Sequence, residues 1–296
     1  MTSPAQRFSY GAHATFPVRY GWLPKGIERL TRQGGFSTST EAADELGLGS
    51  KMVESLGFWL KAMGLSEEGK PGGRDRHASV LAELVARHDR FCELPGTWWF
   101  LHLSLATAPG TVWHWFFNDY SERIFDRVAC IDAFLEHTRS KAVRPATPAM
   151  AQKDVACLLA AYAARPGVDW VDPDDPGACP LRELGLILRH DMVSRFERSR
   201  SVSGVPVEVL LASAAGLGQR TGQQSHSLRE LATLPHGPGR VLCTGLDLLE
   251  EMVETAARSS VHASLETLAG ERRLVVAARP ATEWLGDLYA RVGAVA

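Results

Sequence analysis

Seven tryptophan and phenylalanine side chains fall within the stretch 98–117, and no other feature of the sequence constrains the fold as much. The seven are Trp98, Trp99, Phe100, Trp113, Trp115, Phe116 and Phe117. Large aromatic side chains gain most when buried, so such a belt is more often a core than a platform for stacking bases. The hydrophobic fraction of 45% is enough for a packed core, and a length of 296 residues suits two or three domains. We expect one of them, residues 80–200, to be an aromatic-rich helical middle domain.

The middle domain contains an apolar stripe that starts at the end of the aromatic stretch. Pro109 and Gly110 separate two helices, and from Phe117 onward apolar residues recur at helical spacing. The stripe consists of Phe117, Tyr120, Ile124, Val128, Ile131 and Leu135. This spacing predicts one continuous helix over 117–135. A linker is expected at 140–150, and an acidic, proline-rich loop is expected at 169–177.

Three carboxylates share one face of that predicted helix. Asp119, Glu122 and Asp126 are spaced i, i+3 and i+7, which would bring carboxylate oxygens together as a Mg²⁺ site requires. The alternative is a solvated helix face, because Arg123 and Arg127 lie among them and exposed charge runs are common. Both interpretations follow from the spacing.

Residues 1–79 are expected to form an N-terminal arm and a winged-helix-like DNA-binding unit. Apolar spacing from Tyr20 predicts a first helix, and a run of Ser and Thr marks the start of a short helix over 41–46. A glycine turn leads to a longer helix over 51–63, and a charged, glycine-rich stretch over 66–77 stands where a wing would lie. Any two helices joined by glycines give a similar pattern, so a purely structural unit is the alternative.

Two groups of residues in this unit are candidates for contact with DNA. One group lies at the start of the longer helix, which would be the recognition helix, and comprises Ser50, Lys51 and Ser55. The other group lies on the first helix and would contact phosphates through Lys25, Arg29 and Arg32. Basic side chains of this kind supply the salt-dependent part of DNA affinity.

The arm before the first helix combines polar and aromatic side chains within a short segment. His13, Arg19 and Tyr20 are the candidate catalytic residues, and Pro17 stiffens the segment between them. A guanidinium such as that of Arg19 can bind a phosphate through two parallel hydrogen bonds. The alternative is an arm packed on its own domain, with Arg19 paired to a carboxylate.

Residues 201–296 repeat the pattern of the first unit. Helices are predicted over 207–215, 227–234 and 246–257, and two β-rich runs around Gly270 favour a hairpin. The third helix carries Asp247, Glu250, Glu251 and Glu254. Its acidity makes it a poor reader of a DNA groove and suits contact with proteins. The predicted fold class is therefore mainly α with short β-hairpins, with winged-helix-like N- and C-terminal units around a helical middle.

Charge, cysteine spacing and hydropathy exclude several classes of protein. The net charge of −2 rules out a generally basic nucleic-acid coat, although residues 1–90 carry 12 Lys and Arg against 10 Asp and Glu, and the remainder 20 against 24. The five cysteines form no CxxC pair, which argues against a zinc ribbon and a disulfide scaffold. The acidic loop lacks the ligand spacing of an EF-hand. No apolar leader and no run of about 18 apolar residues is present, so we expect a soluble, cytoplasmic protein.

Short blocks along the chain resemble a bacterial family of domains of unknown function. The blocks lie at 8–26, 46–49, 52–53, 58–60, within 113–118, at 153–155, within 179–187 and, more weakly, at 238–241. They occur in the family's order across nearly the whole chain. The chain departs from the family pattern at Ala14, where we expect an acidic residue, and the match is faint around 200–225.

That family includes SspB, a component of the Ssp DNA phosphorothioation and antiphage defence system. The resemblance implies a DNA-nicking endonuclease that uses Mg²⁺ and cuts one strand so that sulfur can enter the backbone. It also implies partners, namely DNA, an ATPase, a sulfate-reductase-like protein and a cysteine desulfurase. The alternative function is a non-catalytic DNA-binding adaptor that recruits these partners through its acidic C-terminal half.

Overall fold

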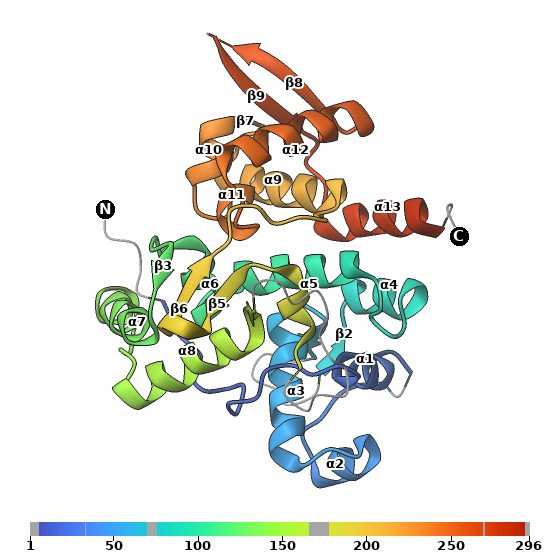
Figure 1. Ribbon diagram of the computed structural model, residues 1–296. Helices are drawn as coiled ribbons and strands as arrows, with labels where there is room; N and C mark the ends of the chain where they lie inside the picture. Colours follow the sequence, from blue (N-terminus) through green and yellow to red (C-terminus); the bar gives the residue numbers. More distant parts are fainter. Residues whose placement is uncertain (1–5, 33, 70–75, 166–177, 269, 294–296) are drawn as a thin grey trace.

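The computed structural model describes residues 6–32, 34–69, 76–165, 178–268 and 270–293. These residues are mainly helical, with three small sheets, so the mainly α fold with short hairpins is confirmed. Figure 1 shows the N-terminal helices at the bottom, the helical middle above them and the C-terminal unit on top. Within the described ranges, no helix is long and apolar enough to cross a membrane. The predicted acidic loop at 169–177 lies outside the described residues.

The N-terminal unit consists of three helices followed by a two-stranded antiparallel sheet. Its elements are α1 (Trp22–Arg32), α2 (Thr40–Leu46), α3 (Ser50–Ala62), β1 (Ser66–Glu68) and β2 (Arg76–Ala78). The side chain of Ser39 caps α2, as the run of Ser and Thr predicts. The residue before α3 is Gly49 and not Ser50, so no side chain caps that helix. Phe36 also bridges Arg76. This order of elements is that of a winged helix, although assignment to that class stays a prediction.

The arm, residues 6–21, packs against the face of α3 that carries Ser55 and Trp59. Ser55 and Trp59 both donate side-chain hydrogen bonds to the carbonyl oxygen of Phe16, at 3.2 and 3.0 Å. The arm then runs against the turn at Gly110, whose φ is +73° and where a Cβ atom would lie 2.0 Å from a carbonyl oxygen of the arm. Only glycine fits such a close approach in this backbone conformation. The arm is therefore an integral part of the fold.

The middle is built around α5 (Pro95–Thr107), which has buried side chains on every face. Helix α4 (Val80–His88) precedes it in the chain, and α6 (Val112–Asn118) and the short 3₁₀ helix η1 (Pro180–Leu184) pack against it. All seven aromatic side chains of the belt are at most 6% exposed, so the interpretation of the belt as core is confirmed. A helix that is apolar all round can lie only inside the protein.

The single helix predicted over 117–135 is wrong. Helix α6 ends at Asn118, a turn and the strand β3 (Ile124–Phe125) follow, and α7 (Arg127–Lys141) begins with Asp126 as its N-cap. Ile124 and Val128, two members of the predicted stripe, are largely exposed. The apolar repeat comes from residues of separate elements, because short apolar runs fit helical and non-helical structure alike.

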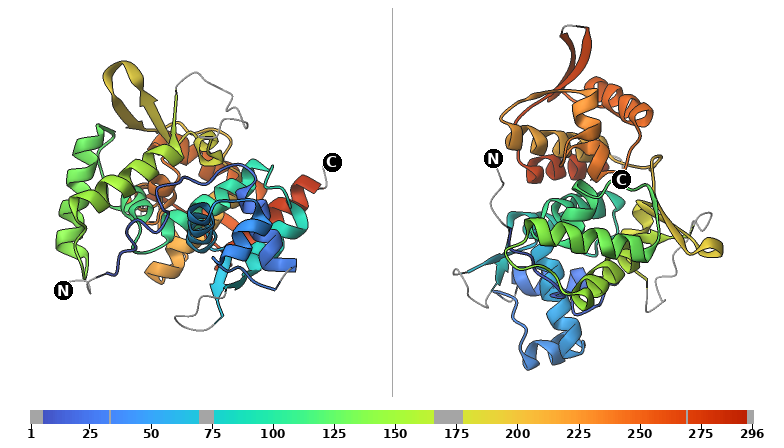
Figure 2. Two further views of the ribbon diagram at one scale, coloured as in Figure 1. Left: turned by 90° about the horizontal axis from the view of Figure 1, so that it is seen from below. Right: turned by 90° about the vertical axis from the view of Figure 1, so that its left-hand side faces the viewer.

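A four-stranded sheet lies beside α7 and α8 (Pro148–Tyr162), which are joined by a short loop where the linker was predicted. The strand order is β3, β6 (Arg195–Arg198), β5 (Ile187–His190) and β4 (Ala163–Ala164), and only the β4–β5 pair is parallel. Strands β5 and β6 and the 3₁₀ turn η2 (Asp191–Val193) form a hairpin that projects from the body in both views of Figure 2.

The C-terminal unit contains the helices and the hairpin that its sequence predicts. Its elements are α9 (Val207–Thr221), β7 (Ser225–Ser227), α10 (Leu228–Thr233), α11 (Pro238–Val241), α12 (Leu246–Ser259), β8 (Ala263–Leu268) and β9 (Glu271–Val276). The three strands form an antiparallel sheet in the order β7-β9-β8. Ser227 and Glu230 form a capping box at the start of α10. The winged-helix assignment of this unit also stays a prediction.

The last helix, α13 (Ala281–Gly293), returns to the middle of the molecule, where Figure 1 shows it between the upper unit and α4. Tyr289 shares a 2.8 Å hydrogen bond with Thr97 of α5 and stacks on His88 of α4 with ring centroids 5.1 Å apart. Arg291 makes two hydrogen bonds to Glu208 of α9, at 2.7 and 2.9 Å. Helix α13 therefore holds the C-terminal unit against the middle, and the domain boundaries expected near 79 and 200 stay predictions.

His102 is an ionisable side chain inside the core of α5, and it links three helices. Its Nε2 donates to the carbonyl oxygen of Val241 in α11 at 2.7 Å, so its Nδ1 accepts from the hydroxyl of Tyr162 in α8 at 2.8 Å. Burial lowers the pKa of His102 to about 4. The imidazole is therefore neutral at pH 7, with both nitrogens hydrogen-bonded.

We expect the free energy of unfolding to fall as the pH drops from 6.5 to about 4. The unfolded chain binds a proton on His102 in this range and the folded chain does not, so the stabilisation is complete above the unfolded pKa and is lost below it. A shift of this size corresponds to about 3 kcal/mol. Urea unfolding across this pH range checks the prediction. His102→Gln should be less stable at pH 7 and less sensitive to pH, and equal pH dependence in both proteins would contradict the assignment.

Candidate functional site

The arm folds around His13, which is 1% exposed. Its Nδ1 accepts the N–H of Thr15 at 3.0 Å, so its proton is on Nε2, which donates to Oδ1 of Asp154 in α8 at 2.8 Å. The same carboxylate oxygen accepts the N–H of Gly11 at 2.8 Å. A buried carboxylate without partners is very costly. The arm therefore supplies the donors that Asp154 needs.

The two residues that follow His13 in the chain have unusual backbone conformations. Ala14 and Thr15 have φ of 48° and 69°, in the left-handed region that residues other than glycine, asparagine and aspartate seldom adopt. Strained residues of this kind persist where the surrounding structure fixes them, often at functional sites. Ala14 is also the position where the sequence comparison led us to expect an acidic residue. An aspartate would relieve part of this strain, and alanine does not.

The burial of His13 argues against the catalytic role predicted for it. The ring packs against Phe58 and Trp113 with centroids 5.8 and 5.7 Å away, and Asp154 occupies its donor nitrogen. A DNA phosphate has no direct approach to either ring nitrogen in this arrangement. The geometry favours a role in positioning the arm, and a catalytic role for His13 stays a prediction.

Arg19 lies against two aromatic rings that contact each other. Its guanidinium carbon is 5.6 Å from the ring centroid of Phe16 and 5.5 Å from that of Trp22, close enough for cation–π attraction. Its Nε is buried and has no hydrogen-bond partner. Arg19 also has no carboxylate partner within the described part of the chain, contrary to the alternative considered from the sequence. It is held by its neighbours but keeps the capacity to bind an anion.

Tyr20 donates its hydroxyl hydrogen to Oε1 of Glu183 in η1. Burial, followed by the hydrogen bond to Glu183, raises the pKa of the Tyr20 hydroxyl. Attack by a tyrosine as nucleophile requires a deprotonated or readily deprotonated hydroxyl, so this environment opposes that role. In the described residues no hydrogen bond joins His13, Arg19 and Tyr20, and the structure does not unite them as one catalytic cluster.

The basic residues predicted on α1 have partners inside the N-terminal unit. Lys25 Nζ donates to the carbonyl oxygen of Leu46 at 2.8 Å. Arg29 pairs with Glu45, and Arg32 pairs with Glu28 of its own helix at 3.4 Å. Lys25 and Arg29 connect α1 to α2, and Arg32 pairs within α1. A DNA phosphate would have to compete with these contacts.

Helix α3 exposes little of the surface expected of a recognition helix. Ser50 and Lys51 are exposed at its start, and Lys51 pairs with Glu54 at 2.8 Å. Ser55, in contrast, is fully buried. The expectation that Ser55 faces DNA is wrong because the arm covers that face of the helix. Of the three predicted residues on α3, two remain available to a ligand.

The three carboxylates proposed as metal ligands lie in different local structures. Asp119 follows the last turn of α6, Glu122 lies in the turn, and Asp126 caps α7 by accepting the N–H of Ala129 at 2.8 Å. They do not share a helix face, so the geometric basis for this metal site is wrong. Across the described residues there is no group of three or more His, Cys, Asp or Glu that could hold a metal ion.

Sequence reasoning missed Asp154 as a site residue. The available signal was a single aspartate on an apolar helix face, between Ala151 and Leu158, both of which are fully buried. An acid at such a position must have a partner. The identity of that partner was hidden because His13 lies 141 positions away in the sequence.

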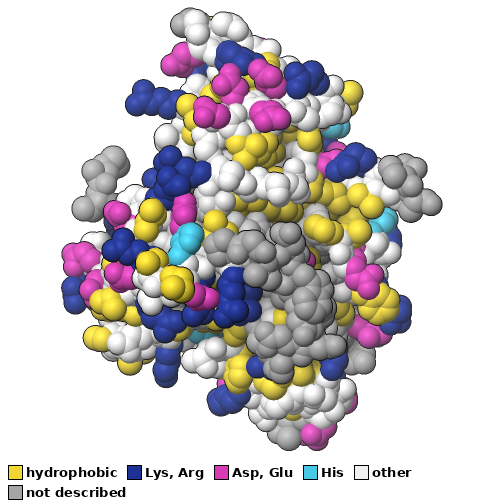
Figure 3. Space-filling model, in the orientation of Figure 1, with side chains coloured by type: hydrophobic (Ala, Val, Ile, Leu, Met, Phe, Trp, Pro, Cys, Tyr) yellow, Lys and Arg dark blue, Asp and Glu magenta, His cyan; other side chains and the backbone are white. Residues whose placement is uncertain are grey.

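The β5–β6 hairpin was also missed as a surface feature. Arg189 and Arg195 are exposed on it, and Met192 at its tip is 98% exposed. Acidic neighbours reduce its charge, since Arg189 pairs with Asp191 at 2.5 Å. Figure 3 shows basic and acidic side chains interspersed on this face of the molecule, not one continuous basic surface.

We expect His13 and Asp154 to act as one structural unit. His13→Ala and Asp154→Ala should each lower the free energy of unfolding by about 3 kcal/mol, because each leaves a buried polar partner unpaired. The double variant should lose clearly less than the sum, with a coupling energy of at least about 1 kcal/mol. Chemical denaturation of the four proteins measures this. Glu136 and Arg139, an exposed pair on α7 at 3.1 Å, provide the control cycle, whose coupling should be below about 0.5 kcal/mol. Additive losses at His13 and Asp154 would contradict the unit.

The fold is similar to that of two solved structures. Two solved structures, described as "SspB crystal structure" and "Magnesium ion-bound SspB crystal structure", superimpose on it with TM-scores of 0.84 and 0.83. Their sequences are 24% and 25% identical to this one, and each likeness covers 97% of this chain and 90% of the other. No curated protein sequence matches the chain significantly.

The family profile described as "Protein of unknown function (DUF4007)" matches residues 10–289. The match spans the arm, the helical middle and the C-terminal unit, so the resemblance seen in the sequence blocks is confirmed. The chain belongs to the DUF4007 family, and its fold is that of the SspB structures.

Proposed function

We propose that this protein is the DNA-nicking subunit of a DNA phosphorothioation system used in antiphage defence. The observation that carries the proposal is the likeness to SspB, which extends over 97% of the chain. Nicking one strand would allow sulfur to enter the backbone. The proposed partners are DNA, an ATPase, a sulfate-reductase-like protein and a cysteine desulfurase, and the proposed location is the cytoplasm.

The proposal includes Mg²⁺ because one of the two SspB structures is described as magnesium-bound. The described residues of this chain do not fit such an ion: they contain no cluster of three or more potential ligands, and Asp119, Glu122 and Asp126 lie in separate local structures. We therefore assign no ligand and no reaction step to a metal. Dependence on Mg²⁺ is a property to be measured.

Among the arm residues, the geometry of Arg19 best supports a role at DNA. Its guanidinium packs against the rings of Phe16 and Trp22, which lowers the entropy lost on binding a phosphate. The planar group can form two parallel hydrogen bonds to phosphate oxygens, and lysine cannot reproduce that geometry. We propose Arg19 as the phosphate-binding residue of the arm.

We expect the purified protein to convert supercoiled plasmid into open circles when Mg²⁺ is present and not when EDTA is added. Arg19→Ala and Arg19→Lys should both slow the conversion by about tenfold or more, the loss expected for a charge-assisted bidentate contact. Gel analysis of plasmid forms over time provides the measurement. Tight DNA binding without conversion of the supercoiled plasmid, even with the partner subunits added, would contradict the nickase proposal.

A non-catalytic DNA-binding adaptor is the second candidate function. The observation that favours it is that the described residues hold no metal-ligand cluster, while the side chains of His13 and Tyr20 are each hydrogen-bonded to a carboxylate of the protein itself. An adaptor would bind DNA and the partner subunits, and the plasmid would stay supercoiled unless a partner cut it.

DNA contact at the start of α3 can be tested by comparing two lysines of that helix. Lys51 pairs with Glu54 at 2.8 Å near the start of α3, and Lys61 pairs with Glu68 at 2.6 Å near its end. In a recognition helix the N-terminal residues reach the bases and phosphates. Lys51→Ala should weaken binding to all sequences and reduce the slope of log affinity against log salt by about one unit.

Lys61→Ala is the matched control and should leave affinity and salt slope unchanged. Fluorescence anisotropy with a labelled duplex at several salt concentrations measures both. If Lys51→Ala behaves like Lys61→Ala, the start of α3 does not contact DNA.

A further inference from the structure

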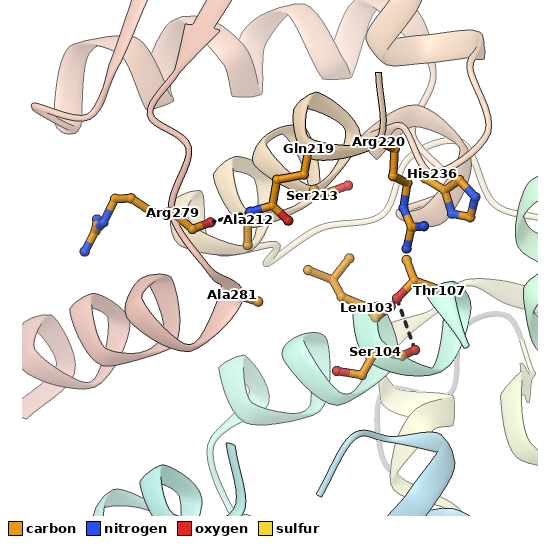
Figure 4. Close-up of a pocket in the computed structure, with 11 residues that line it drawn as sticks. Leu103, Ser104, Thr107, Ala212, Ser213, Gln219, Arg220, His236, Arg279 and Ala281 are labelled. Atoms are coloured by element: carbon orange, nitrogen blue, oxygen red, sulfur yellow. Dashed lines mark hydrogen bonds between the residues drawn. The ribbon is translucent and has the colours of Figure 1, made fainter. Parts of the chain in front are cut away.

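A cavity of about 350 Å³ lies between α5 of the middle and α9 of the C-terminal unit. Figure 4 shows Leu103, Ser104 and Thr107 on its lower wall and Ser213, Gln219 and Arg220 on its upper wall, with His236 beside Arg220. Its volume falls within the range of small-molecule sites. Both parts of the molecule therefore contribute to a space that could hold a ligand of nucleotide size.

The charge of the cavity is positive. None of its lining residues is an aspartate or a glutamate. Arg220 has no ion-pair partner in the described part of the chain, and Figure 4 shows its guanidinium directed into the space between the two walls. The other arginine of the lining, Arg279, is occupied by Glu283 at 2.8 Å and Asp287 at 2.6 Å. Arg220 is thus the lining arginine that is free to meet an anion.

Two further polar atoms of the lining lack partners. Ser213 is 6% exposed, and its hydroxyl is buried without a hydrogen bond. The Nδ1 atom of His236 is buried and equally unpartnered. In contrast, the hydroxyls of Ser104 and Thr107 donate to carbonyl oxygens of their own helix. Leaving a buried donor unsatisfied costs about 1–3 kcal/mol, and native structures rarely tolerate it without a reason.

The position of His236 is imposed by a buried amide. Its φ is 65°, and its N–H donates to Oδ1 of Asn118 at 2.6 Å. The amide nitrogen of Asn118 donates in turn to the carbonyl oxygens of Ala106 and His114, at 2.8 and 2.9 Å. A strained residue held this firmly indicates a position selected for function. The turn that carries His236 is therefore fixed against α6 and α5.

We propose that this cavity binds a phosphate group, with Arg220 supplying the charge and Ser213 and His236 supplying hydrogen bonds to its oxygens. Phosphate oxygens accept several hydrogen bonds at once and are favoured by an unpaired guanidinium. The phosphate can belong to a free small molecule, such as a mononucleotide, or to the DNA backbone. The inference does not rest on nicking activity, because the cavity keeps these groups in either of the two proposed functions.

The electrostatic surroundings of His236 agree with an anion site. Burial, followed by the positive charge of Arg220 and the proximity of His114, lowers the pKa of His236 to about 4. His114 in turn is influenced electrostatically by Asp119, Arg220 and His137. A bound anion opposes the repulsion from Arg220, so phosphate should raise the pKa of the His236 imidazole.

Isothermal titration calorimetry with the full chain tests the proposal, using inorganic phosphate and deoxyadenosine monophosphate as probes. Arg220→Ala should weaken the binding of at least one probe about tenfold or more, the loss expected for a charge-assisted hydrogen bond. Arg229→Ala is the matched control, since Arg229 is an exposed arginine of the same unit and does not line the cavity. A duplex DNA titration over several salt concentrations forms the second arm.

Gly216→Phe provides an independent variant that leaves the charge unchanged. Gly216 lines the cavity, and a Cβ atom there would meet no atom within 4 Å, so a phenyl ring can fill the space and exclude the probe. Thermal unfolding shows whether this variant is folded, and Ser213→Ala replaces it if it is not, with a smaller loss expected.

The outcomes separate the sources of the phosphate. Loss of small-probe binding in Arg220→Ala, but not in Arg229→Ala, supports a free phosphate ligand. Loss confined to duplex binding, with a lower salt slope in Arg220→Ala alone, supports a DNA phosphate. Equal behaviour of Arg220→Ala and Arg229→Ala in both arms, or no binding of any probe by the natural sequence, overturns the proposal.

Discussion

The fold depends on the burial of α5, a helix with large apolar side chains on every face. Such a helix gains stability only when other elements cover its whole circumference, so α6, η1, α9 and α13 all pack against it. The N-terminal arm, the middle and the C-terminal unit consequently share one hydrophobic core. Two polar side chains of this helix, Thr97 and His102, are fully buried, and both are tolerated because they are hydrogen-bonded.

Buried polar groups then determine where the outer segments attach. Asp154 accepts hydrogen bonds from Gly11 and His13 and so fixes the arm on α8. Asn118 accepts one from His236 and fixes the turn between α10 and α11. Apolar packing tolerates small displacements, whereas a buried hydrogen bond specifies distance and direction. One result is that the arm covers α3. If α3 enters a DNA groove, the face of α3 that carries Ser55 is unavailable unless the arm moves.

Local signals predicted the elements whose structure is decided locally. Helix starts at Ser39 and Ser227 followed from side-chain caps, and the C-terminal hairpin followed from β-rich runs around Gly270. The helix over 117–135 failed because its apolar residues belong to α6, β3, α7 and the turns between them, a grouping that periodicity cannot reveal. The failure carried over to Asp119, Glu122 and Asp126, whose predicted alignment required that helix.

The candidate site was harder to predict because its contacts join residues far apart in the chain. His13 and Arg19 were recognised as unusual by residue type, yet their surroundings come from α8 and from neighbouring aromatic rings. Ser55 is a small polar residue near the start of a helix, so the sequence predicts that it is exposed. Its burial depends on Phe16 of the arm, which precedes it by 39 positions. Asp154 and Asn118 show the same limit. A polar residue on an apolar helix face indicates that it has a hydrogen-bond partner, but the sequence does not show which residue that partner is.

The cavity between α5 and α9 lies where the C-terminal unit packs against the middle. Some charged side chains elsewhere in the C-terminal unit are already paired: Arg272 of β9 forms ion pairs with Glu250 and Glu254 of α12, at 2.7 and 2.8 Å. Arg220 is different, since it meets the cavity without such a partner. A ligand that touches both walls binds only the docked arrangement of the middle and the C-terminal unit, and by linkage it stabilises that arrangement.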